Sequence, residues 1–215
     1  MTPFCRWLSI IEMCSTSPER RSSGLFALRS YAIIIVVVVM SGCGKPFNVK
    51  PRTELPRAEY TATATTDQIT VQAKPITDEN FLYETFDANL ILAGVLPVRV
   101  RLTNPAEETL NLAKARFAIR AGNTGRAFKS VAARQAFKRV ISYYEISTYN
   151  KAGFKESLDD FSAYALDTER PLTGRESREG LLFFLVGGDV IRDAGLILEI
   201  SKLNGKQEPV QVKLN

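Results

Sequence analysis

Few side chains of this protein have the type and spacing that catalysis needs. The chain contains no histidine, which excludes Ser-His-Asp and Cys-His catalysis and metal sites built from histidine and cysteine. Glu107-Glu108 and Asp159-Asp160 are neighbouring pairs without calcium-loop spacing, so we expect solvated loop charges. Gly122-Asn123-Thr124-Gly125 lacks the lysine of a phosphate-binding loop and is typical of a turn. The sequence predicts a non-enzyme without metal or cofactor; a carboxylate hydrolase would need two carboxylates facing each other in a cleft.

Cys43 follows a short apolar segment. Residues 31–40 are about half as long as the roughly 20 residues that a helix needs to cross a bilayer, and Arg29 prevents extension backwards. Arg20 and Arg21 add to the positive flank ahead of it. This pattern is typical of the core of an export signal peptide.

Met40-Ser41-Gly42-Cys43 resembles the lipobox of bacterial lipoproteins, an aliphatic residue and two small residues before a cysteine, although Met40 stands where leucine is usual. The resemblance implies that Cys43 is acylated and that the chain is cut just before it. Two or three acyl chains, each CH₂ contributing about 0.8 kcal/mol, would then hold the protein on a membrane. Gly44, in place of the aspartate that favours inner-membrane retention, implies the outer membrane facing the periplasm if the host has two membranes. The alternative is an ordinary signal peptide or a membrane anchor with a chance cysteine.

The expected organisation is a signal peptide at 1–42, a lipidated cysteine with an extended tether at 43–57, and a folded domain at 58–215. The tether is expected to be stiff because it contains three prolines and few large apolar side chains, and it could lift the domain up to roughly 40 Å above the lipid. The prolines are Pro46, Pro51 and Pro56.

Cleavage before Cys43 would change what the composition implies. It removes Cys5 and Cys14, so residues 43–215 can form no internal disulfide bond. It also removes four basic and two acidic residues, which lowers the formal net charge from +5 to about +3. Such a balance gives no reason to expect a nucleic-acid partner.

Alternation of apolar and polar residues predicts short strands along the folded domain. The clearest strand is 98–103, ended by a turn at Asn104-Pro105, and its arginines are expected to lie on a solvated sheet face. The continuous apolar run 181–186 is suited to a central strand, and Asn204-Gly205 predicts a hairpin turn. Further strands are expected at 60–64, 69–73, 110–120 with a bulge near Ala113, 196–200 and 210–214.

One amphipathic helix is expected between Ser130 and Ile146, where the apolar period changes from two to nearly four and Ser130 could cap the helix. Its polar face is basic and either lies in water or contacts anionic lipid headgroups. The candidate membrane-contact residues are Lys129, Arg134, Lys138 and Arg139. Residues 147–170 are expected to be irregular, with four side chains that reach the core: Phe154, Phe161, Tyr164 and Leu166.

About seven such strands predict a mainly β, antiparallel sandwich with one helix inserted around 130–146. The layout resembles the small immunoglobulin-like domains of bacterial lipoproteins of unassigned function. The resemblance rests on a strand ending in asparagine at 98–104 and a glycine-bearing loop that leads into an apolar strand at 172–184. A fold resemblance of this kind implies nothing about activity.

The sequence therefore predicts a membrane-anchored envelope lipoprotein whose sandwich is a non-catalytic interaction or structural module. Its expected partners are membrane lipid, through acylated Cys43, and an unknown envelope protein. The alternative is a carrier or sensor that binds a small or lipid-like ligand between the helix and the sheet. A pocket lined by Phe137, Tyr144 and Phe161 would favour that alternative, and a filled interface would oppose it.

Overall fold

The structure is a computed structural model that describes residues 47–52, 59–122, 124–148, 150–191, 195–203 and 208–214. Cys43, the apolar segment before it and the Asn204-Gly205 turn lie outside these residues. Within them, no helix is both long enough and apolar enough to cross a membrane.

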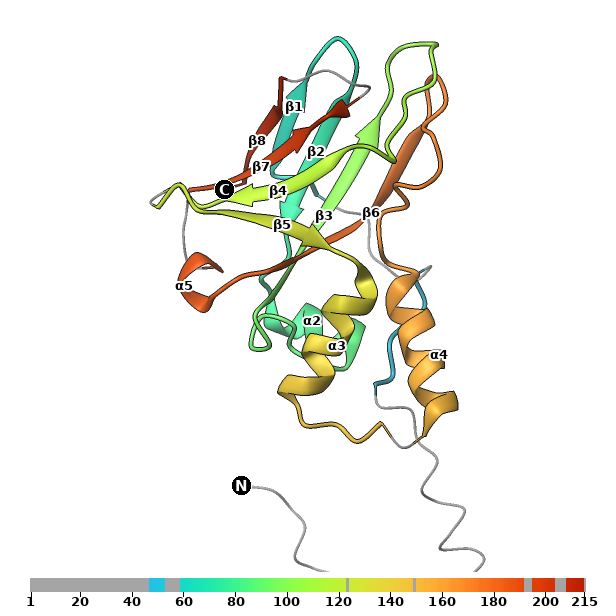
Figure 1. Cartoon of the computed structure of the whole chain (residues 1–215), viewed down its shortest axis with the longest axis vertical. Coiled ribbons are helices and arrows are strands. Elements are labelled where there is room, and N and C mark those ends of the chain that lie inside the picture. Colours follow the sequence, from blue (N-terminus) through green and yellow to red (C-terminus); the bar gives the residue numbers. More distant parts are fainter. Residues whose placement is uncertain are drawn as a thin grey trace, which may run out of the picture. The chain divides into compact units, whose positions relative to one another are not determined.

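The described part of the domain is mainly β, and eight antiparallel strands form one sheet in the order β1-β2-β3-β6-β5-β4-β7-β8. The edge strands approach each other, since β1 and β2 also contact β8. The sheet is therefore nearly closed and resembles a barrel (Figure 1). The strands are β1 (Ala62–Thr65), β2 (Thr70–Pro75), β3 (Val95–Thr103), β4 (Arg116–Arg120), β5 (Ala127–Val131), β6 (Ser177–Leu185), β7 (Leu196–Ser201) and β8 (Val210–Leu214).

Three helices of eight or more residues occur in the described ranges, and they lie together at one end of the sheet (Figure 1). They are α2 (Glu79–Phe86), α3 (Ala133–Tyr143) and α4 (Lys151–Ser162), and the short α5 (Gly188–Ile191) follows β6. The side chains of Asp78 and Asn150 accept hydrogen bonds from the first turns of α2 and α4, which fixes where these helices begin. No side chain caps α3.

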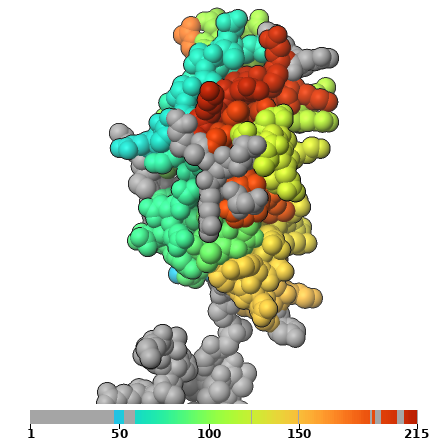
Figure 2. All heavy atoms as spheres, turned by 90° about the vertical axis from the view of Figure 1, so that its left-hand side faces the viewer, coloured from blue at the N-terminus to red at the C-terminus, as the bar shows by residue number. Residues whose placement is uncertain are grey.

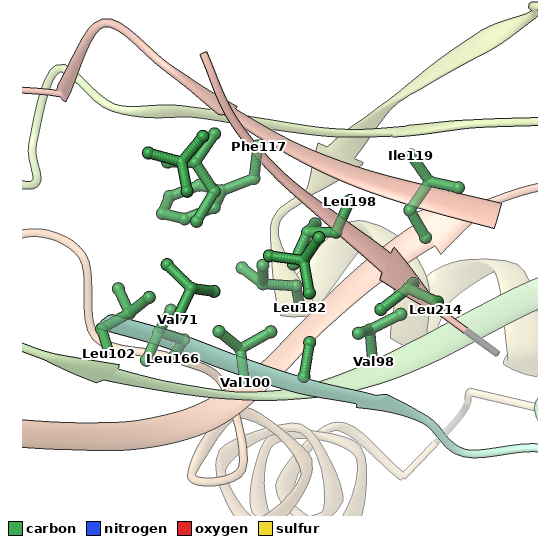
Figure 3. Close-up of a cluster of buried hydrophobic side chains, with 14 of the residues drawn as sticks. Val71, Val98, Val100, Leu102, Phe117, Ile119, Leu166, Leu182, Leu198 and Leu214 are labelled. Atoms are coloured by element: carbon green, nitrogen blue, oxygen red, sulfur yellow. The ribbon is translucent and has the colours of Figure 1, made fainter. Parts of the chain in front are cut away.

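Apolar side chains form two cores on opposite faces of β6. Leu182 points into the barrel, where alternate residues of β3 such as Val98 and Val100 also point (Figure 3), and Phe184 belongs to the same core. Phe183 points outward to the helices, and its ring stacks on Phe161 of α4 with centroids 4.9 Å apart. Because both faces of β6 are buried, its sequence is a continuous apolar run.

Several expectations are confirmed. The described domain is mainly β and its sheet is antiparallel. The strands expected at 98–103, 181–186, 196–200 and 210–214 are β3, β6, β7 and β8. The helix expected within 130–146 is α3. Phe161, Tyr164 and Leu166 are buried, and Phe154 is half-buried against the helical core.

Other expectations are wrong in detail. The described residues contain eight strands, in one nearly closed sheet, where about seven were expected, and three helices of this length where one was expected. Ser130 belongs to β5, a strand that the sequence did not reveal because no side chain of its five residues is fully buried. The supposed bulge near Ala113 is a turn, in which the Ala115 N–H donates to the Leu112 carbonyl at 2.9 Å.

Residues 147–170, expected to be irregular, contain α4. The sequence did not reveal this helix because its apolar stripe is narrow. Among its twelve residues only Gly153, Ser157 and Phe161 are buried, so a helical period is hard to see in the sequence. Likewise α2 buries only Leu82, Thr85 and Phe86.

Candidate functional site

Residues 47–52 pack against the helices, which corrects the predicted tether. Phe47 and Val49 are 5% and 6% exposed. The Phe47 ring lies edge-on to Phe137 and Tyr144, with centroid distances of 6.0 and 6.2 Å. An extended segment can bury alternate side chains, and the alternation of apolar and polar residues from 47 to 50 was the signal that could have revealed this contact.

Hydrogen bonds to α2, to α4 and to Tyr164 just after α4 hold the backbone of segment 47–52. The Lys50 N–H donates to the Thr85 carbonyl at 2.8 Å. The hydroxyl of fully buried Ser157 donates to the Phe47 carbonyl at 2.9 Å, and the Tyr164 hydroxyl donates to the Lys50 carbonyl at 2.6 Å. Because these bonds replace those to water, the segment is part of the folded domain.

Three of the four predicted membrane-contact residues share one helix face. Arg134, Lys138 and Arg139 are exposed on α3, opposite its buried face. The Arg139 Nε donates to the Ala93 carbonyl at 3.0 Å, which ties α3 to the loop between α2 and β3. Lys129 is exposed on β5 and does not belong to the helix.

Three large apolar side chains stand out from the described surface, namely Tyr83, Leu92 and Tyr143, which are 47%, 50% and 46% exposed. We call them the exposed apolar patch. They come from α2, the loop after it and the last residue of α3, and Figure 2 shows α3 (gold) beside the green of α2 and its following loop.

Tyr144 connects two members of this patch, Tyr83 and Tyr143. Its ring lies 5.1 Å from that of Tyr143, and its hydroxyl exchanges hydrogen bonds of 3.1 Å with the backbone N–H and carbonyl of Asn89. Burial, followed by the interaction with Tyr83, raises the pKa of Tyr144 to about 12. The hydroxyl therefore stays protonated at neutral pH and holds α3 against the end of α2.

The arginines of β3 form ion pairs, so they do not make a free basic surface. The Arg99 Nε donates to Glu179 Oε1 at 2.5 Å, and an Arg101 guanidinium nitrogen lies 2.7 Å from Glu179 Oε2. Burial raises the pKa of Glu179, but the hydrogen bonds, that from Arg101 first, outweigh it and leave the pKa below its usual range. Burial and the neighbouring Glu179 carboxylate raise the pKa of Tyr60 to about 12. On this side of the sheet one carboxylate is shared by two guanidinium groups, which compensates part of their positive charge.

A cavity of about 190 Å³ lies where β5 separates from β6. In β5 only Ser130 and Val131 pair with β6, which leaves a gap in the sheet beside the start of α3. The cavity is lined mainly by apolar side chains, among them Phe117, Leu166 and Leu182. It is not the pocket that a ligand-binding function would need between α3 and the sheet, because rings fill that interface: Phe137 and Phe161 pack with centroids 5.4 Å apart.

The carboxylate pairs lie on different elements. Glu107 and Glu108 are exposed on the loop after β3, as expected, whereas Asp159 and Asp160 are on α4 and not on a loop. Across the described residues, no group of three or more acidic or cysteine side chains could hold a metal ion. Of the predicted turn at Gly122-Asn123-Thr124-Gly125, Asn123 lies outside the described residues; the other three stand between β4 and β5, and the Gly125 N–H donates to the Ala121 carbonyl at 2.7 Å.

No protein-family model matches the chain, and no curated protein matches it. Among solved structures, the chain is similar to an uncharacterized beta-sandwich protein from Clostridium difficile 630, with 12% sequence identity. The match covers 74% of this chain and 99% of that one, with a TM-score of 0.32. A likeness of this size does not extend to function.

Proposed function

We propose that this protein is a membrane-anchored lipoprotein of the cell envelope whose immunoglobulin-like β-sandwich domain is a non-catalytic interaction or structural module. The observation that carries the proposal is the apolar segment 31–40 followed by Met40-Ser41-Gly42-Cys43. Acyl chains on Cys43 would make stable membrane binding, since one chain alone gives only marginal attachment. The proposed location is the outer membrane facing the periplasm if the host has two membranes.

The packing of segment 47–52 supports a short link between anchor and domain. Only residues 44–46 separate Cys43 from Phe47, whose side chain is buried. The exposed basic residues of α3 would add attraction to anionic headgroups, about 1 kcal/mol for each cation near the surface. Ion pairs and filled cores elsewhere in the described domain favour a rigid module that presents its surface to an envelope protein.

The test is metabolic labelling of the full chain with a palmitate analogue. Cys43→Ser should abolish the label and release the protein from membranes, because Cys43 is the proposed acylation site. Cys14→Ser is the matched control, since it changes a cysteine that the proposed cleavage removes, and it should label like the parent chain. Equal labelling of Cys43→Ser would overturn the proposal.

The cavity between β5 and β6 favours a second candidate, a carrier or sensor of a small ligand. The cavity is open to solvent and is lined by Ser130 and Thr168 as well as by apolar side chains, so that a small molecule could enter it. Xenon should shift the NMR signals of the Leu166 and Leu182 methyl groups, and Ala133→Leu should remove the shift because Ala133 lines the cavity. Absence of a shift in the parent protein would leave this candidate without support.

A further inference from the structure

We infer that the helical end of the domain rests on the bilayer and that the exposed apolar patch of Tyr83, Leu92 and Tyr143 contacts the lipid headgroup region. This inference rests on the proposed acylation of Cys43. It names the orientation and the contact surface that such an anchor would impose.

The first argument is the reach of the chain. Phe47 is fixed by its buried ring and by the hydrogen bond from Ser157 to its carbonyl. Four Cα steps separate Cys43 from Phe47, so their Cα atoms are at most about 14 Å apart at 3.3–3.6 Å per residue. A lipidated Cys43 therefore holds the domain close to the bilayer at the point where Phe47 enters the fold.

That entry point lies in the helical layer. The Phe47 ring contacts Phe137 and Tyr144 of the α3 region, and its carbonyl is bound to α4. Figure 1 shows segment 47–52 (blue) alongside α4, at the end of the sheet where the helices gather. The helices, and not the β1–β2 turn, would face the lipid.

The patch begins one side chain away from Phe47. The Phe47 ring lies 6.2 Å from that of Tyr144, which lies 5.1 Å from that of Tyr143. Tyr83 interacts with the same Tyr144 hydroxyl. Leu92 adjoins Ala93, whose carbonyl accepts the hydrogen bond from Arg139 on α3. Tyr83 and Tyr143 thus lie beside Tyr144, one ring away from Phe47, and Leu92 lies on the loop that Arg139 ties to α3.

Their chemistry suits a headgroup region, where tyrosine is enriched because its ring is apolar and its hydroxyl is polar. The exposed Lys138 and Arg139 of α3 would add attraction to anionic headgroups. The anchor makes such a weak contact effective by keeping the patch at a high local concentration near the lipid.

A tryptophan reporter can test the orientation. The only tryptophan of the chain is Trp7, which precedes Cys43, so the cleaved protein has none. Full chains carrying Tyr143→Trp or Thr63→Trp are expressed, purified in acylated form and placed in vesicles that contain brominated phospholipids. Thr63 is the matched control because it is exposed on β1, at a distance from the helices (Figure 1). We expect quenching several-fold stronger for Tyr143→Trp than for Thr63→Trp.

A second comparison isolates the patch. Tyr83→Trp should be quenched like Tyr143→Trp, and adding Leu92→Ser and Tyr143→Ser should lower its quenching towards that of Thr63→Trp. An unchanged urea midpoint shows that these exposed substitutions leave the fold intact. Equal quenching of Tyr143→Trp and Thr63→Trp in protein whose mass shows acylation would overturn the inference alone. A mass without acyl chains would instead overturn the proposed function on which it rests.

Discussion

The Ser157 hydroxyl donates a hydrogen bond of 2.9 Å to the backbone carbonyl of Phe47, 110 residues earlier in the chain. Both groups are shielded from water, because Ser157 is fully buried and Phe47 is 5% exposed. The bond joins α4 to segment 47–52 and so makes a stretch expected to be a tether into part of the helical core.

Ser157→Ala should therefore destabilise the domain by about 1–2 kcal/mol, because the Phe47 carbonyl would remain buried without its donor. The free energy of unfolding in urea measures this loss. Ser142→Ala is the control, since Ser142 is exposed on α3 and alanine suits a helix. Equal stabilities of the two variants would show that the bond contributes nothing.

Phe47→Ala should lower the free energy of unfolding by about 2–4 kcal/mol, because it removes a ring that packs against Phe137 and Tyr144. Chemical denaturation of the parent and the variant provides the measurement. Asn48→Ala changes an exposed side chain of the same segment and should stay within about 0.5 kcal/mol of the parent. A neutral Phe47→Ala would mean that the segment does not stabilise the fold.

Gly180→Ala should cost about 2–3 kcal/mol. A Cβ at this position of β6 would lie 2.5 Å from the Leu166 Cα and 2.6 Å from the Leu166 nitrogen, so the backbone would have to move. Gly188→Ala is the matched control, because nothing lies within 4 Å of its added Cβ. Thermal unfolding should separate the two variants, and a Gly180→Ala protein as stable as Gly188→Ala would contradict the close approach.

Acid should destabilise the domain in part through Glu176. Hydrogen bonds from Arg178, and then from the Thr173 N–H and hydroxyl, lower its pKa from 4.5 to about 2. A pKa depressed by folding gives stability that is present above the unfolded value of 4.5 and is lost as the pH falls through about 2. Glu176→Gln should therefore unfold more easily than the parent at pH 7, and the difference should shrink from pH 4.5 downwards. Urea midpoints between pH 7 and pH 2 measure it, and a constant difference would contradict the assignment.

Much of the sheet could be predicted because strand patterns are local. Val98, Val100 and Leu102 alternate with Arg99 and Arg101, and the structure buries the first set inside the barrel. The apolar run of β6 was correctly predicted as central, since a strand covered on both faces has no polar side. The strand β5 was missed because its short sequence carries no such alternation.

The helical end was harder to predict. Ser157 in α4 has no apolar side chain to mark it as buried, and its role depends on the Phe47 carbonyl. Cys43 illustrates the opposite case, because a lipobox is a local motif and needs no fold to be seen; it lies outside the described residues and stays a prediction.

The sequence by itself determined the absence of histidine chemistry, the candidate anchor at Cys43 and the alternating strands, since each is a property of composition or of neighbouring residues. Only the tertiary structure decided that the sheet nearly closes, that Arg99 and Arg101 share Glu179, and that Phe47 is bound by Ser157. The last two features join residues 80 and 110 positions apart, and the sheet closes between β1 and β8, which are further apart in the chain. Contacts over such separations arise from packing and hydrogen-bond satisfaction in the folded chain, which a local sequence pattern does not encode.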